Sequence, residues 1–100
     1  MEPIVNDDKL MLMLNVTHKL RKVLQREGKG YQSELQRCLG VGLTDVDFAL
    51  CVNLLVVEGW CTLSKGKKDA PILTFNEAYK NTKIFTPAEV IADAMKQQEQ

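Results

Sequence analysis

The sequence lacks a surplus of either charge. Lys and Arg together number 13, as do Asp and Glu, so the net charge is zero. A chain without a basic surplus has no long-range field that draws it onto nucleic acid, and such binding then depends on local patches. Aromatic residues make up only 6% of the chain, but 45% of its 100 residues are hydrophobic, which is enough for the core of one domain.

Metal-binding and disulfide-forming residues are scarce. There is one histidine, His18, and an odd number of cysteines without a C-x-x-C motif. Each cysteine lies within an apolar segment, which predicts buried, reduced thiols and neither a disulfide framework nor a zinc site. We therefore expect no metal and no cofactor. The cysteines are Cys38, Cys51 and Cys61.

Long apolar runs and a secretory signal are also missing. The longest apolar stretch, within residues 48–57, is interrupted by Asn53 and falls short of the about 18 residues that a membrane span needs. The start of the chain, M-E-P-I-V-N-D-D, has no basic region followed by an apolar core. We expect no membrane association and a cytoplasmic or nucleoid-associated location.

Catalytic patterns are absent as well. The sequence shows no nucleophile with a base and an orienting partner, and no cluster of metal ligands. Its paired glycines, Gly28 with Gly30 and Gly40 with Gly42, do not follow a predicted strand, so a phosphate-cradling loop is not indicated. We predict that the protein is not an enzyme.

What is present begins with a long amphipathic pattern. Apolar residues recur at three- and four-residue steps and predict a first helix from Asp7 to Glu27. Its N-terminal half is more apolar than one buried face requires, which favours packing against a second protomer. The stripe consists of Leu10, Met13, Val16, Leu20, Val23 and Leu24, widened by Met11, Leu12 and Leu14.

Two capped helices are predicted next. The second helix begins at Ser33 and ends at Gly40, and the third begins at Thr44 and runs to about Glu58, where Gly59 closes it. Both starts have the spacing of a capping box, in which two side chains three residues apart satisfy each other's backbone donors. The pairs are Ser33 with Gln36 and Thr44 with Asp47.

A hairpin and a last helix complete the pattern. Residues 60–64 and 71–75 read as two strands joined by the turn K-G-K-K-D, and residues 76–82 as a short helical or irregular segment. The motif T-P-A-E from Thr86 predicts the start of a C-terminal helix. We expect a flexible lead-in at residues 1–6, a domain at 7–82, and the last helix with a frayed tail at 83–100. The apolar face of that helix is Val90, Ile91, Ala94 and Met95.

These residues carry a resemblance to a known family. The segments S-E-L-Q-R-C-L-G and V-N-L-L-V-V-E-G-W, followed by K-G-K-K-D-A-P-I-L-T, resemble the winged-helix domains of small prokaryotic regulators of the MarR and ArsR type. The resemblance covers about two thirds of the chain, from Leu10 to Phe75. It implies an α+β, mainly helical winged helix-turn-helix with a two-stranded wing, here with an added C-terminal helix.

The third helix departs from that family where DNA would be read. In DNA-binding members this helix lies in the major groove and presents hydrogen-bonding side chains. Here Phe48, Val52 and Leu55 are best placed inward, and the outward line is acidic at its start and apolar along its length. Asn53 is its only clear polar reader. The outward line is Asp47, Leu50, Cys51, Leu54 and Val57, with Asp45 nearby.

The apolar character of both lines leaves alternatives open. If the inward and outward lines were exchanged, both would still be largely apolar, and a helix that is apolar all round is buried on two sides. The second side would then be covered by a second copy of the chain, by another protein, or by the C-terminal helix at 87–95 folding back within the monomer.

Local basic patches favour nucleic acid. Lys65, Lys67 and Lys68 place three positive charges on the hairpin tip, where they could contact phosphates, and Tyr31 and Arg37 lie near the second helix. The alternative for the lysines is a solvated turn. A second basic row on the first helix is a solvent-exposed flank or a docking surface for an acidic partner. That row is His18, Lys19, Lys22 and Arg26.

Two functions follow from these features. The favoured prediction is a non-enzymatic winged-helix interaction module that modulates a partner protein, or self-associates as a dimer, through its apolar third helix. The alternative is a DNA-binding transcriptional regulator that contacts phosphates through its basic wing.

Overall fold

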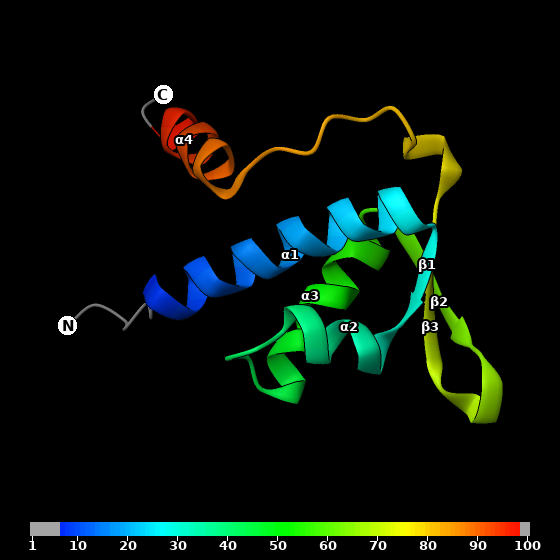
Figure 1. The fold of residues 1–100 in the computed structure, drawn as a ribbon. Helices are drawn as coiled ribbons and strands as arrows, with labels where there is room; N and C mark the ends of the chain where they lie inside the picture. The colour runs from blue at the N-terminus through cyan, green and yellow to red at the C-terminus, as the bar shows by residue number, and fades with distance from the viewer. Residues whose placement is uncertain (1–6, 99–100) are drawn as a thin grey trace.

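The computed structural model describes residues 7–98 and shows an α+β fold that is mainly helical, as predicted (Figure 1). The lead-in predicted at residues 1–6 and the last two residues of the predicted frayed tail lie outside the described residues. The helices are α1 (Asp7–Glu27), α2 (Gln32–Leu39), α3 (Asp45–Val57) and α4 (Pro87–Gln98). The strands are β1 (Lys29–Tyr31), β2 (Cys61–Lys65) and β3 (Pro71–Phe75), and short 3-10 turns span Lys67–Asp69 and Glu77–Tyr79.

Helix α1 is the longest helix that contributes to the core. It has the predicted bounds, and its stripe buries Val16, Leu20 and Leu24. Phe48 of α3 and Leu73 of β3 belong to the same buried cluster. Figure 1 shows α1 between α4 on one side and α2 with α3 on the other, with the sheet near the C-terminal end of α1.

The sheet has three antiparallel strands, so the predicted two-stranded wing was incomplete. Strand β3 lies in the middle and pairs with β2 on one side and with β1 on the other. The hairpin register places Leu63 opposite Leu73, and β1 pairs Gly30 with Leu73. Strand β1 was missed because it has only three residues and follows directly after Gly28 at the end of α1.

The start of the second helix also differs from the prediction. Helix α2 begins at Gln32, its N-cap is Tyr31, and no side chain caps it. The capping box predicted for Ser33 and Gln36 is therefore wrong. The chain enters α2 directly from β1, so the strand's last residue occupies the cap position that was assigned to Ser33.

The caps of the two later helices were predicted correctly in position. The Thr44 side chain accepts a hydrogen bond from the Asp47 backbone N–H at 3.1 Å, and Gly59 follows α3 with a φ of +89°. At α4 the capping box is complete, because the Thr86 backbone N–H donates to Glu89 Oε1 at 2.9 Å and the Glu89 N–H donates to Thr86 Oγ1 at 3.2 Å.

Helix α4 packs on α1, and the outward side of α3 stays open to solvent. The alternative in which the C-terminal helix folds back over α3 is therefore wrong. Residues 80–86 carry the chain from the sheet past the C-terminal end of α3, where Lys83, Ile84 and Phe85 line a hollow with Glu58 and Trp60, and Figure 1 shows α4 across α1 from α2. Helix α4 thus packs on α1 and does not cover the outward side of α3.

Candidate protein-interaction site on helix α3

The inward face of α3 is the one predicted from the sequence. Phe48, Val52 and Leu55 are all almost completely buried. Their spacing of four and three residues places them on one side of the helix, against α1 and the sheet. The prediction of the helix phase is therefore confirmed, and the exchanged arrangement is wrong.

The outward face presents large aliphatic side chains to solvent. Leu50, Leu54 and Val57 are 49%, 56% and 84% exposed. Val46, one turn before Leu50, is 70% exposed and was not among the predicted site residues. Its signal was in the sequence, because positions 46, 50 and 54 continue one helical line at steps of four. We call Val46, Leu50, Leu54 and Val57 the α3 stripe.

Asp47 does not belong to that surface, although it was predicted to face outward. It is buried, and Lys9 of α1 places its Nζ 3.0 Å from Asp47 Oδ2. This ion pair neutralises the carboxylate at the junction of α1 and α3. The acidic start of the stripe is thereby reduced to Asp45, which is exposed. The exposed face of α3 is consequently more apolar than the sequence suggested.

Cys51 is buried, which confirms the predicted buried thiol and shows that its placement on the outward line was wrong. Its Sγ lies 3.9 Å from the Met13 carbonyl oxygen on α1, and burial raises the pKa of the thiol. Cys61 is buried as predicted, and burial, aided by the Glu58 carboxylate, raises its pKa to about 11. Cys38, predicted to be buried, is exposed on α2. Two of the three thiols are thus poor nucleophiles near neutral pH.

The hairpin tip presents its lysines as predicted. Lys65, Lys67 and Lys68 are exposed, and Lys68 adopts a left-handed conformation with a φ of +56°. Asp69, with a φ of +62°, lies among them and offsets part of their charge. The tip is therefore a small basic surface with a net charge of about +2.

Tyr31 and Arg37 have different surroundings. Tyr31 anchors the hairpin, because its Oη accepts a hydrogen bond from the Lys67 backbone N–H at 3.4 Å and its ring lies where a side chain on Gly66 would go. Arg37 is exposed in the last turn of α2. Tyr31 thus supports the structure of the tip, and Arg37 is an exposed cation.

A further large apolar residue, Leu63, is exposed on the sheet. Leu63 on β2 is 44% exposed. Side chains alternate along a strand, so Leu63 lies on the same face as Cys61, which is buried against the core. Sequence reasoning assigned the strand correctly but did not single out this position.

The part of the chain that the structure describes offers neither a cluster of metal ligands nor a helix that could span a membrane. Residues 7–98 contain no group of three or more His, Cys, Asp or Glu side chains that could hold a metal ion. Within the same residues, no helix is both long enough and apolar enough to cross a bilayer.

Comparison with known proteins adds no assignment. No protein-family model, curated protein or solved structure matches this chain. The case for a function therefore depends on the surface geometry described above.

Proposed function

We propose that this chain is a non-enzymatic winged-helix interaction module that binds a partner protein by placing the α3 stripe in an apolar groove. The order α1, β1, α2, α3, then the β2–β3 hairpin supports the winged-helix assignment. The exposure of three large side chains, Leu50, Leu54 and Val57, on one face of a well-packed helix carries the functional proposal. The opposite face of α3 packs in the core, and no residue of the stripe belongs to the buried cluster.

The stripe has enough apolar surface to drive association. Complete burial of a Leu or Val side chain contributes about 1.5–3 kcal/mol relative to full exposure. Because the four residues of the stripe are between 49% and 84% exposed, most of that contribution is still available to a partner. Within residues 7–98 the stripe stays exposed, since α4 lies against α1.

The size of the stripe favours a grooved partner over a second copy of the chain. Helix α3 has 13 residues, which corresponds to a length of about 20 Å and a width of about 10 Å. Such a face offers only a few hundred Å², below the about 800 Å² per partner of a stable interface. A groove encloses the helix on both flanks and recovers more area, as in helix-in-groove recognition. Acidic side chains on the rim of that groove would complement the lysines of the hairpin tip.

A site-specific photo-crosslinker tests this proposal. A benzoyl-phenylalanine residue is placed at position 54 or 57 in the native host, and at position 19 as a control on the exposed side of α1. We expect a discrete crosslinked species from positions 54 and 57 only. That species should disappear when Leu50→Asp is added, because a charge in the stripe opposes its burial.

Mass spectrometry of the crosslinked species decides the outcome. A partner of a different sequence that requires positions 54 and 57 supports the proposal. A species composed of two copies of this chain would contradict the choice of a different partner. The same species from position 19, or none from positions 54 and 57, would contradict the site itself.

The exposed basic tip favours a second candidate function, DNA binding through the hairpin. Three lysines support a slope of log affinity against log salt no steeper than about −3. A mobility-shift titration with mixed duplex DNA at low salt tests it, with Lys67→Glu/Lys68→Glu as the variant and Lys19→Glu/Lys29→Glu, which lies outside the hairpin tip, as the control. The absence of a shift at low salt would remove this candidate.

A further inference from the structure

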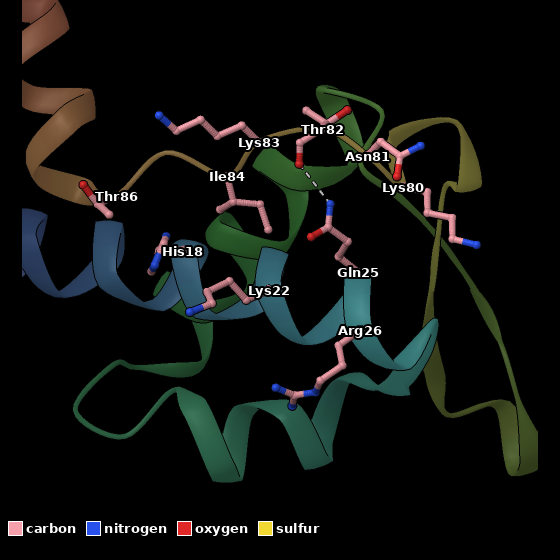
Figure 2. A pocket seen from close by; sticks show the side chains of 10 residues that line it. All are labelled: His18, Lys22, Gln25, Arg26, Lys80, Asn81, Thr82, Lys83, Ile84 and Thr86. Carbon is pink, nitrogen blue, oxygen red and sulfur yellow. Dashed lines mark hydrogen bonds between the residues drawn. The ribbon is translucent and has the colours of Figure 1, made fainter.

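A basic hollow lies on the side of α1 that faces residues 80–86, the connection between the sheet and α4 (Figure 2). Its volume is about 710 Å³, within the range of small-ligand sites. Four cationic side chains and the only histidine of the chain line it, and no carboxylate does. These residues are His18, Lys22 and Arg26 from α1, and Lys80 and Lys83 from the connection.

Hydrogen bonds made by Gln25 and His18 hold the two walls of the hollow together. Gln25 Nε2 donates hydrogen bonds to the carbonyl oxygens of Tyr79 at 3.1 Å and Thr82 at 3.0 Å. The Nδ1 atom of His18 lies 3.2 Å from the Phe85 carbonyl oxygen. Figure 2 shows Gln25 reaching from α1 to Thr82. The walls are therefore positioned without help from the cations, which remain available to a ligand.

The positive charge of the hollow is only partly compensated. Arg26 pairs with Glu27 at 2.9 Å and Lys83 with Glu89 at 3.4 Å, but neither carboxylate lines the hollow. Within residues 7–98, Lys22 and Lys80 form no ion pair. Figure 2 shows the amines of Lys80 and Lys83 directed away from one another, so both side chains change rotamer when they contact one ligand.

We propose that this hollow binds an anion of the oligophosphate class, with phosphate groups bridging α1 and the connection. Phosphate oxygens accept charge-assisted hydrogen bonds from ammonium and guanidinium groups. Because the cations lie on both walls, an anion with several phosphates contacts both walls at once, whereas a single phosphate contacts only one. Either a free oligophosphate, such as a nucleotide, or a nucleic-acid backbone carries this chemistry. The site shares no residue with the α3 stripe, so the two proposals stand or fall separately.

The single histidine makes the site directly observable. At fixed pH and ionic strength, tripolyphosphate is titrated into the full-length protein while the imidazole C–H signals of His18 are followed by NMR. We expect a saturable shift in the wild type. The variant Lys22→Glu/Lys80→Glu should bind at least about tenfold more weakly, because it reverses the two uncompensated charges. The control Lys19→Glu/Lys29→Glu, with the same change in net charge outside the hollow, should bind as the wild type does.

Several outcomes would overturn the assignment. A shift that does not saturate, or one that sulfate at equal ionic strength reproduces, shows only adventitious ion binding. Equal weakening in both double variants would mean that net charge, not the hollow, attracts the anion. If Lys22→Glu/Lys80→Glu does not fold by circular dichroism, Lys22→Gln/Lys80→Gln takes its place, and unchanged binding by that variant contradicts the site.

Two further arms assign the source of the phosphate and separate the proposals. A short single-stranded oligonucleotide that displaces tripolyphosphate from wild type, but binds the Lys22→Glu/Lys80→Glu variant at least about tenfold more weakly, identifies a nucleic-acid backbone. Failure to displace it identifies a free oligophosphate. Leu54→Asp should leave the tripolyphosphate titration unchanged, because Leu54 lies on α3 and does not line the hollow.

Discussion

Cys38 and Cys61 have the same side chain in opposite surroundings. Cys38 is exposed, whereas Cys61 is buried and its pKa is raised to about 11. The thiolate is the reactive form, so at pH 8 only about one Cys61 thiol in a thousand is ionised. We expect iodoacetamide at pH 8 to alkylate Cys38 alone in the folded protein and all three cysteines in urea. Peptide mass spectrometry measures this, and rapid labelling of native Cys61 would contradict it.

At the residue scale, side-chain directions on α3 were predictable except at the border between its two faces. Each residue turns the helix by about 100°, so positions 47 and 51 lie between the inward and outward lines. Nothing in the local sequence placed Asp47 inward, whereas the apolar segment around Cys51 did predict a buried thiol. Their burial results from α1, which supplies Lys9 to Asp47 and the Met13 carbonyl oxygen to Cys51. Contacts between residues so distant along the chain are invisible to periodicity.

At the scale of elements, the end of α2 depends on a residue without a side chain. A Cβ added at Gly40 would lie 2.7 Å from Phe48 Cδ1 and 2.9 Å from the Gln36 carbonyl oxygen. The Phe48 ring is completely buried and has no room to move. We expect Gly40→Ala to lower the free energy of unfolding by about 1–3 kcal/mol. Urea denaturation measures this, with the exposed position Ser33→Ala as the control; a loss below 0.5 kcal/mol, taken as about the limit for surface changes, would contradict it.

Helix α3 offers a matched pair of adjacent leucines. Leu54 is 56% exposed and Leu55 is fully buried. We expect Leu54→Asp to leave the thermal unfolding transition within a few degrees of the wild type, because its carboxylate stays in water. Leu55→Asp should abolish cooperative unfolding, since a carboxylate without a partner would enter the core. Circular dichroism distinguishes the two, and unfolding of Leu54→Asp would show that the stripe belongs to the core.

The elements that the sequence did not reveal are those that depend on distant partners. Helices α1, α3 and α4 were predictable because their periodicity and caps are local. Strand β1 was not, because its three residues include Gly30 and come directly after Gly28. Its pairing partner is β3, more than 40 residues further along the chain. The missing side chain at Gly30 is what lets the strand pass close to Leu35, which a Cβ would approach within 3.2 Å.

At the scale of the whole molecule, the path of the connection determines both candidate surfaces. Because residues 80–86 lead to α1, helix α4 packs on α1 and the stripe stays exposed. The same path brings Lys80 and Lys83 beside the basic row of α1, where the hollow forms. The sequence predicted the basic row and the apolar line separately. It could not predict the hollow, because its walls are more than 50 residues apart in the chain.

Helix α4 lies outside the buried cluster that stabilises the fold. The fully buried cluster ends at Phe75, and α4 contributes none of its members. We expect a chain ending at Phe85 to keep its free energy of unfolding within about 1 kcal/mol of the full chain, because it retains both Gln25 hydrogen bonds and the contacts of Ile84 with the core. Trp60, the only tryptophan, reports the transition by fluorescence in urea.

A chain ending at Asn76 is the matched control for that truncation. It loses the Tyr79 ring, whose centroid lies 5.4 Å from that of Trp60, and both hydrogen bonds of Gln25. An aromatic pair contributes about 0.5–1.5 kcal/mol and each hydrogen bond about 1 kcal/mol, so a loss of roughly 2–4 kcal/mol is expected. If the truncation at Phe85 proved as costly as the one at Asn76, α4 would be part of the cooperative core.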